Sequence, residues 1–490
     1  MSKHHYYFIG IGGTAMASVA SALAKSGETV SGSDSGVYPP MSTFLQSQGI
    51  PYHTSYSEEQ ILNSGASHIV VGNAISRGNP ELEAALNLRL PLLSMSEIIK
   101  TKLIESHTSL VVTGTHGKTT TTSIAAFLAD AVGLNTGFLI GGIPENFGYG
   151  ARPVPNPNAS GVFIIEGDEY DTAFFDKRSK FLHYRPDIAI VNNIEFDHAD
   201  IFASIEEIEL SFRRFINLIP KNGILLVNAA DSRAVALAKK SLAPVEQFQV
   251  CTDREPLGEA EWEAGEIELD SGETRFHIFF RGESVAKVSS PLAGYHNVSN
   301  ALAAIAAVYH AGEKKKSVSE IAGRLSHFKS PKRRLEVIAD NSRRQITVVD
   351  DFAHHPTAIR ETLKALAQRF PQRRIVTAFE PRSNTTTRSF FQTELALCFE
   401  LASVVGIGAV NRPERYSESE RLNPKKLEMA LNENGKAAYA TPIPVPENHI
   451  DLLAAFITAQ VRDGDVVILL SNGSFDGLGQ KVIHQLGLNQ

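Results

Sequence analysis

Short apolar runs alternate with stretches of helical periodicity along the first part of the chain. The predicted strands are residues 6–10, 28–34 and 68–73, and the predicted helices are residues 14–26 and a segment after Pro80. Strands that alternate with helices indicate a parallel, doubly wound sheet whose faces are covered by the helices. We therefore expect residues 1–104 to form a Rossmann-like α/β domain.

A second series of apolar runs begins at residue 109. The predicted strands are residues 109–114, 161–168, 187–193 and 223–231. Runs that are apolar throughout are typical of parallel strands buried on both faces. Residues 266–290 instead show an alternating pattern interrupted by turn residues, which predicts antiparallel hairpins. Helices are expected at 298–311 and 318–326. Residues 105–328 should thus form a central domain with a parallel sheet and a small antiparallel sheet.

The basic, proline-containing segment 327–334 predicts a linker or hinge into a third α/β block. The predicted strands of that block are residues 333–340, 345–351, 373–380, 402–408 and 465–473, with helices after Pro356, Arg388, Pro424, Asn448 and Phe475. We expect residues 329–490 to form a C-terminal Rossmann-like domain. A chain of 490 residues is consistent with roughly three domains at about 150 residues each.

Composition narrows the class of protein. Hydrophobic residues make up 43% and charged residues 21%, as in ordinary globular chains. The net charge is −7 and the basic residues are scattered, which argues against a nucleic-acid partner. Cys251 and Cys398 lack the spacing of a zinc site or a disulfide framework, and no apolar run reaches membrane-spanning length. A cytoplasmic protein with no membrane partner is the expectation.

The segment TGTHGKTTTT, residues 113–122, joins a predicted strand to a predicted helix and indicates a phosphate-binding loop. Lys118 would reach the β- and γ-phosphates, and the Thr119 hydroxyl would meet Mg²⁺. The longer form of the motif would place glycine where this chain has Val112. The predicted ATP-binding residues of the loop are Gly114, Thr115, His116, Gly117, Lys118, Thr119 and Thr120.

Two polar clusters follow strands of the central block. Glu166, Asp168, Glu169 and Asp171 are crowded together, and two carboxylates about 4 Å apart repel by about 4 kcal/mol at an effective dielectric of 20. A cation reverses that penalty, so Glu166 is the candidate Mg²⁺ ligand beside Thr119; the alternative is a solvated acidic loop.

His198 lies among Glu195, Asp197 and Asp200 and suggests a second ion, although an isolated loop histidine is often structural.

Asn297 and Asn300 fall on one face at the start of a helix, where their amides could contact an adenine edge or could cap the helix.

In the first block, Gly10, Gly12 and Ala15 follow a strand, and Asp34 comes about 20 residues later, which is typical of a dinucleotide-binding motif. The same motif serves any ligand with a diphosphate and a ribose, so it does not separate NAD from a UDP-sugar.

The third block carries its polar residues after strands as well. Residues 350–356, preceded by Arg333 and Arg334, could hold the ribose of ATP and offset phosphate charge. The adjacent His354 and His355 should point to opposite sides of an extended segment, which disfavours a metal site formed by the pair. The arginine-containing loops 379–388 and 410–415 could recognise an acidic substrate.

Taken in order, these motifs resemble the Mur ligase family, three-domain enzymes that use ATP to join amino acids or peptides to UDP-N-acetylmuramic acid. The resemblance covers essentially the whole chain and starts at residues 8–34, where the family holds the UDP-sugar. Residues 166–187, 192–202, 379–385 and 411–415 are similar to members that attach the recycled tripeptide L-Ala-γ-D-Glu-meso-diaminopimelate. Members that add L-alanine would show EADES where this chain has EGDEYDT.

The resemblance implies roles for individual residues. Catalytic roles fall on Lys118, Glu166, His198 and Arg334; metal binding on Thr119, Glu166 and His198; ATP binding on the loop and on Asn297, Asn300, Arg334 and Asp351; UDP-sugar binding on Gly10, Gly12, Gly13, Asp34, Asn73 and Ser76; and peptide binding on Arg382, Asn384 and Arg412. Arg213 occupies the place nearest to a lysine that several members carbamylate, so no lysine carbamate is expected.

The implied reaction uses ATP and two Mg²⁺ ions and passes through an acyl phosphate, and it needs no obligate protein partner. Three alternatives stay open at this point: an L-alanine-adding member of the family, an NAD-dependent oxidoreductase, and a non-catalytic nucleotide-binding switch.

Overall fold

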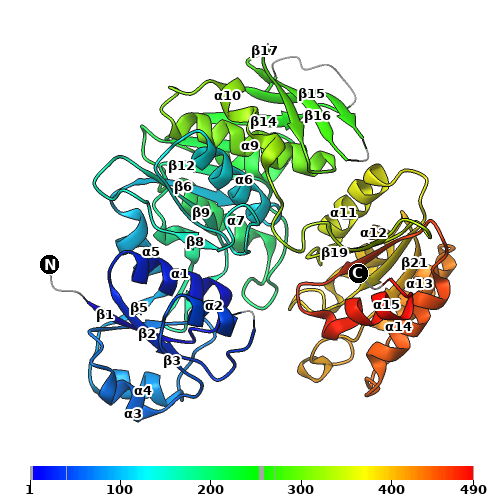
Figure 1. Ribbon diagram of the computed structural model, residues 1–490, viewed down its shortest axis with the longest axis horizontal. Coiled ribbons are helices and arrows are strands. Elements are labelled where there is room, and N and C mark those ends of the chain that lie inside the picture. Colours follow the sequence, from blue (N-terminus) through cyan, green and yellow to red (C-terminus); the bar gives the residue numbers. More distant parts are fainter. Residues whose placement is uncertain (1–3, 40, 253–258, 271, 489–490) are drawn as a thin grey trace.

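The computed structural model describes residues 4–39, 41–252, 259–270 and 272–488. These residues form three α/β bodies that follow one another along the chain, coloured blue, cyan to green, and yellow to red in Figure 1. The central body lies between the other two in sequence and carries the phosphate-binding loop. None of the helices in the described part of the chain has the length and apolar character needed to span a bilayer.

The first body is a five-stranded, fully parallel sheet in the order β3-β2-β1-β4-β5, as the alternation of strands and helices predicts. Its strands are β1 (His5–Ile9), β2 (Thr29–Ser33), β3 (Tyr52–His53), β4 (His68–Val71) and β5 (Leu92–Ser94). Its helices are α1 (Thr14–Lys25), α2 (Met41–Ser47), α3 (Glu58–Ser64), α4 (Pro80–Asn87) and α5 (Met95–Ile99), which runs on into the π-helix η1 (Lys100–Ile104).

The central body holds a ten-stranded sheet in the order β17-β16-β15-β14-β13-β12-β6-β9-β7-β8. Its strands are β6 (Thr108–Thr113), β7 (Thr136–Leu139), β8 (Ala151–Arg152), β9 (Val162–Gly167), β12 (Ile188–Val191), β13 (Ile224–Asn228), β14 (Val245–Val250), β15 (Trp262–Leu269), β16 (Thr274–Phe280) and β17 (Glu283–Ser290), beside a small hairpin of β10 (Asp171–Ala173) and β11 (Asp176–Ser179). Its helices are α6 (Lys118–Ala131), η2 (Lys180–His183), α7 (Ile205–Ile216), α8 (Ser232–Ala238), α9 (Tyr295–Ala311), α10 (Val318–Ala322) and η3 (Leu325–His327).

The predicted antiparallel hairpins are confirmed, but the expectation that they form a sheet of their own is wrong. β15 pairs in parallel with β14 and in antiparallel fashion with β16, so the hairpins extend the parallel sheet into one mixed sheet. The first hairpin strand also begins earlier than predicted, at Trp262, and residue 271 in its turn lies outside the described residues. Residues 262–265 at the start of β15 are all buried, so the alternation of exposed and half-buried residues begins only at Glu266.

Successive residues of β6 face opposite sides of the central sheet. Leu110 and Val112 belong to a core with α6 and α9, whereas Val111 belongs to a core with α7. Both faces are therefore buried, and the carboxyl end of the strand is the place where polar side chains can gather. The core on the α7 side also includes Met16 and Leu23 of α1, so the first and central bodies share one hydrophobic core.

The third body is a six-stranded sheet in the order β18-β19-β23-β20-β21-β22. Its strands are β18 (Glu336–Asn341), β19 (Ile346–Asp351), β20 (Ile375–Phe379), β21 (Ala402–Ile407), β22 (Ala437–Ala440) and β23 (Val466–Leu470). Its helices are α11 (Pro356–Arg369), η4 (Ser389–Phe391), α12 (Gln392–Cys398), η5 (Pro413–Arg415), α13 (Pro424–Glu433), α14 (His449–Gln460), η6 (Phe475–Gly477) and α15 (Leu478–Gln485). β18 is antiparallel to β19, which differs from a purely βαβ arrangement because a short turn, not a helix, joins the two strands.

Replacing Phe248 with alanine should destabilise the central body by about 3–5 kcal/mol, the usual cost of truncating a fully buried phenylalanine. Phe248 is completely buried on β14 and is the register partner of Trp262, the chain's single tryptophan. Urea unfolding followed by tryptophan fluorescence measures the loss. Truncation of Leu242, which is 76% exposed, should change the midpoint little, and an equal loss in both variants would contradict the packing described here.

Candidate active site

The loop between β6 and α6 needs glycine at two positions. Gly114 has φ 135° and Gly117 has φ 81°, both in the region that side chains with a Cβ rarely adopt. A Cβ on Gly117 would lie 2.5 Å from Oδ1 of Asn300, and one on Gly114 would lie 3.0 Å from Cβ of Asn192. The backbone of the loop therefore passes directly over two asparagines, and its shape depends on having no side chain at either glycine.

Part of the loop backbone is already bonded within the protein. The Thr115 N–H donates to the backbone oxygen of Asn193 (3.1 Å), and the His116 N–H donates to the Asn193 side chain (2.8 Å). These two amides are therefore already engaged. The amides that follow, at the start of α6, are the ones expected to cradle a phosphate, because the first N–H groups of a helix have no partner inside the helix. The place of Asn193, two residues after the buried strand β12, was the available signal for its role.

Lys118 is held by the loop itself and by an acidic neighbour. Its Nζ lies 2.6 Å from the carbonyl oxygen of Gly114 and 2.9 Å from Oε2 of Glu169. Burial lowers the pKa of Lys118, but the carboxylates of Glu169 and Asp168 raise it by more, so the pKa lies above its ordinary value. The ammonium group stays charged over the loop.

Glu169 connects the two cationic groups of the site, a role that the sequence analysis did not assign. Its Oε2 meets Lys118, and its Oε1 lies 3.2 Å from Nε2 of His198. Burial raises the pKa of Glu169, but Lys118 and His198 lower it by more, so the pKa falls to about 2. The Glu169 side chain is only 3% exposed, so an ionised carboxylate in the protein interior holds Lys118 and His198 in position.

Glu166 and Thr119 meet as the sequence predicts. The Thr119 hydroxyl donates to Oε2 of Glu166 (3.1 Å), and the Gly141 N–H donates to Oε1 (2.6 Å). Burial and the nearby Asp168 raise the pKa of Glu166 to about 7. Carboxylate oxygens next to a hydroxyl are the donors that Mg²⁺ prefers, so these residues fit a divalent cation.

His198 has a left-handed backbone, with φ 54°, in the loop after β12. Such a conformation costs about 1–3 kcal/mol and is typical of functional loops. The Ile201 and Phe202 amides donate to its carbonyl oxygen, which holds the turn. Burial lowers the pKa of His198, but the bond to Glu169 raises it to about 9. Arg213 is exposed on α7, and the expectation of no lysine carbamate stays a prediction.

In the nucleotide-free and metal-free protein, His198 should titrate with a pKa near 9. This pKa should fall by at least about one unit in Glu169→Gln. Because the folded pKa lies above the ordinary 6.5, the stabilisation by this pair is complete below that value and is lost as pH rises through about 9. NMR titration of ¹³C-labelled histidine, assigned with His198→Gln, measures both values. Glu145→Gln, an exposed change, is the control; an unchanged His198 pKa in Glu169→Gln would contradict the contact.

Asn297 and Asn300 lie on one face of α9, as predicted, and both are buried. Asn300 accepts a bond from the Thr121 hydroxyl (3.0 Å) and donates to Oδ1 of Asn297 (3.2 Å), while Asn297 donates to the Ala293 carbonyl (2.7 Å). Asn300 thus supports the phosphate-binding loop through its contact with Thr121. Adenine contact by Asn297 and Asn300 stays a prediction.

The glycine loop of the first body has its predicted form. Gly10 has φ 88°, and Gly13 immediately precedes α1. Asp34 accepts from the Gly12 N–H (2.9 Å) and the Gly36 N–H (3.0 Å), so it braces the loop and both of its oxygens are engaged. The predicted sugar-binding residues Asn73 and Ser76 are exposed at the end of β4, and Asn73 donates to Asp171 of the central body (3.3 Å).

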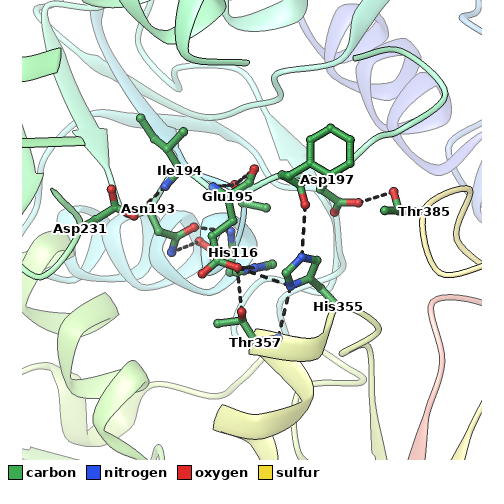
Figure 2. A network of polar contacts seen from close by, with 12 residues as sticks. His116, Asn193, Ile194, Glu195, Asp197, Asp231, His355, Thr357 and Thr385 are labelled. Carbon is green, nitrogen blue, oxygen red and sulfur yellow. Dashed lines mark hydrogen bonds and ion pairs between the residues drawn. The ribbon is translucent and has the colours of Figure 1, made fainter. Parts of the chain in front are cut away.

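Polar contacts join the third body to the loop after β12, and Figure 2 shows them at close range. The Thr357 hydroxyl donates to Oε2 of Glu195 (2.7 Å), and the Thr385 hydroxyl donates to Oδ1 of Asp197 (2.6 Å). Asn384, a predicted peptide-binding residue, donates to Asp200 (2.8 Å) and is engaged in this contact. Both the loop after β12 and the third body carry residues with predicted functional roles, but no sequence pattern indicates that the two segments touch.

The other residues predicted in the third body lie at the carboxyl end of its sheet. Asp351 is buried and accepts from the Leu335 and Ala353 amides (2.7 and 2.8 Å). The Arg334 guanidinium lies 5.1 Å from the Phe352 ring and is close enough to Glu166 to lower its pKa. Arg382 pairs with Glu380 (3.1 Å), and Arg412 is exposed with a left-handed φ of 50°.

Comparison with known proteins agrees with this geometry. Residues 5–104 match the "Mur ligase family, catalytic domain", residues 112–308 the "Mur ligase middle domain", and residues 333–473 the "Mur ligase, glutamate ligase domain". The UDP-N-acetylmuramate–L-alanyl-γ-D-glutamyl-meso-2,6-diaminoheptandioate ligase of Haemophilus influenzae is 40% identical over 99% of both chains. The UDP-N-acetylmuramate–L-alanine ligase of a Roseiflexus species is 32% identical over 98% of this chain and 99% of its own length.

Among solved structures, a murein peptide ligase from Psychrobacter arcticus matches with a TM-score of 0.71 and 33% identity, over 99% of both chains. Its fold therefore follows that of the present chain from end to end.

Proposed function

The chain belongs to the Mur ligase family, and from this premise we propose that it joins the lactyl carboxylate of UDP-N-acetylmuramate to the tripeptide L-Ala-γ-D-Glu-meso-diaminopimelate, converting ATP to ADP and phosphate. Recycling of cell-wall peptide is the process that such a reaction serves, and the cytoplasm, where ATP and UDP-sugars are found, is its proposed location. An oxidoreductase would leave the phosphate-binding loop and both acidic clusters without a role.

One observation carries the proposal. Lys118, Thr119, Glu166 and His198, four residues with predicted phosphate or metal roles, meet at the carboxyl end of the central sheet, where Glu169 links Lys118 to His198 and Thr119 contacts Glu166. This arrangement occurs in a chain that aligns over 99% of its length with a ligase for this tripeptide.

We assign the first half-reaction to the phosphate-binding loop. The lactyl carboxylate attacks the γ-phosphorus of ATP, the bond to the β-phosphate oxygen breaks, and ADP leaves with that electron pair. The charged Lys118 offsets negative charge that grows on the phosphate oxygens, and Arg334 adds a second positive charge from the third body. The product is an acyl phosphate on the sugar.

The second half-reaction is attack by the alanine amine of the tripeptide on the acyl phosphate carbonyl. The C–N bond forms, phosphate leaves, and the nitrogen loses one proton to give the amide. Water would destroy the acyl phosphate, so the contacts of Thr357 and Thr385 with the central body have a chemical purpose, which is to hold the third body over the reacting groups.

We propose that Thr119 and Glu166 hold one Mg²⁺ ion and that His198 contributes to a second. When bound, such ions supply charge neutralisation for the phosphates. His198 must lose its proton to bind a metal, and Glu169, which holds the protonated ring in the metal-free protein, then keeps Lys118 as its partner.

The second candidate function is addition of L-alanine to the same sugar, which the 32% identical relative from Roseiflexus favours. Both reactions share the loop, the ions and the acyl phosphate, so they differ only in the acceptor.

The proposal is tested by ADP release with Mg-ATP, UDP-N-acetylmuramate and the tripeptide, omitting each substrate in turn. Turnover that requires all three supports the ligase. ATP binding without release of ADP under any combination would indicate a nucleotide-dependent switch and overturn it.

A further inference from the structure

Two imidazoles and one carboxylate meet between the central and third bodies, and none of them belongs to the Lys118–Glu169–His198 group. His116 lies in the phosphate-binding loop and Glu195 in the loop after β12. His355 is the residue immediately before α11. Nε2 of His116 lies 3.4 Å from Oε2 of Glu195, and Nδ1 of His355 lies 3.6 Å from the same oxygen. The three atoms all lie within 4.8 Å of one another, and Figure 2 shows both rings turned toward the carboxylate.

We propose that His116, Glu195 and His355 form a binding site for a divalent transition-metal ion of the Zn²⁺ type. In a tetrahedral site with bonds of about 2.0–2.1 Å, neighbouring ligand atoms are about 3.3–3.4 Å apart, close to the two nitrogen–oxygen distances in the protein. Two imidazoles and one carboxylate suit zinc, copper or nickel, whereas Mg²⁺ prefers oxygen ligands. The chemistry is therefore different from that of Thr119 and Glu166.

The protein orients the His355 ring for this purpose. Nε2 of His355 lies 3.3 Å from the carbonyl oxygen of Phe196, so the ring hydrogen belongs on Nε2 and the lone pair of Nδ1 points toward Glu195. A carbonyl behind a metal-binding histidine is the usual device that fixes its tautomer. Nδ1 also accepts a 3.3 Å bond from the Thr357 N–H, a weak cap of α11 that a metal would replace.

The site is open to solvent on one side. A cavity of about 590 Å³ is lined by Glu195, His355 and Thr357 together with Arg233, Phe390 and Phe391. An ion can enter from it, and water can complete the coordination there. Because His116 is in the phosphate-binding loop and His355 is the N-cap of α11, a bound ion would tie the third body to that loop and restrain its movement.

The experiment titrates the nucleotide-free, full-length protein with Co²⁺, whose visible absorption reports low-coordinate nitrogen and oxygen ligation. We expect one such Co²⁺, displaced by one equivalent of Zn²⁺. His355→Asn keeps an acceptor at the cap of α11 but removes the imidazole, and it should weaken binding by at least about 100-fold, more than the loss of an outer-sphere contact would. Glu195→Gln should do the same and provides a second variant if the first does not fold.

Two matched controls locate the ion. His354→Asn removes the adjacent imidazole, whose Nδ1 lies 3.0 Å from the carbonyl oxygen of Phe352, and His198→Asn removes the imidazole of the proposed Mg²⁺ site. Both should keep the Co²⁺ spectrum. No spectrum in the unmodified protein, a spectrum unaffected by His355→Asn and Glu195→Gln, or one lost in His198→Asn would overturn the proposal and leave the cluster as a polar contact between the two bodies. The measurement involves no turnover, so it is independent of the proposed ligase function.

Discussion

Lys118→Ala is expected to lower kcat/KM for ADP release by about 100- to 1000-fold, the usual cost of removing one group that stabilises transition-state charge. The ammonium group sits 2.6 Å from the Gly114 carbonyl and stays charged despite burial, so its removal takes a positive charge away from the loop. Steady-state ADP release with all three substrates measures the effect, and Lys240→Ala, an exposed change, is the control.

Loss of Lys118 also leaves Glu169 buried with one partner fewer, which could unfold the site rather than stop the chemistry. The double variant Lys118→Ala/Glu169→Gln separates the two effects because it removes the carboxylate together with the ammonium group. It should regain thermal stability without regaining activity. Activity within about tenfold of the unmodified protein in either variant would contradict the role of Lys118.

Glu166→Gln should lower kcat by about 100-fold or more, because charge stabilisation by a bound metal ion is worth several kcal/mol. The amide keeps an oxygen for the Gly141 N–H but loses the negative charge that faces Thr119. Turnover measured over a range of Mg²⁺ concentrations should show that the variant needs a higher Mg²⁺ concentration for half-maximal activity. Glu145→Gln, an exposed change, is the control.

Glu166→Gln should also change how the Mg²⁺ requirement depends on pH. Since burial raises the pKa of Glu166 to about 7, its proton competes with Mg²⁺ below that value. The Mg²⁺ concentration for half-maximal activity should therefore rise as pH falls through about 7 in the unmodified protein and should change much less in Glu166→Gln. Equal pH dependence in both proteins would remove Glu166 from the metal site.

The order of the elements was predictable because their sequence patterns are local. Strands of the central sheet are apolar on both faces, and the loop before α6 has a spacing of glycine, lysine and threonine that only phosphate binding explains well. The single mixed sheet was not predictable in the same way. β15 joins β14 across a chain segment outside the described residues, and strand pairing at that distance leaves no periodic signal.

The site was predictable residue by residue but not as a set of contacts. Thr119 and Glu166 were placed together by the need to neutralise acidic side chains. Glu169 was one of four nearby carboxylates, and only the folded chain shows that it is the one between Lys118 and His198. Glu195 and His355 come from segments far apart in sequence, so their meeting depends on how the third body docks, which no local pattern encodes.

A ligase for the tripeptide should prefer the tripeptide to L-alanine as its acceptor. A competition experiment supplies UDP-N-acetylmuramate and Mg-ATP with equal concentrations of the tripeptide and L-alanine and identifies the products by mass. We predict that the tripeptide product exceeds the alanine product by about 100-fold or more, because a site built for a larger polar acceptor leaves its groups unpaired around alanine. Predominance of the alanine product would contradict the tripeptide specificity and assign the chain to the L-alanine-adding reaction.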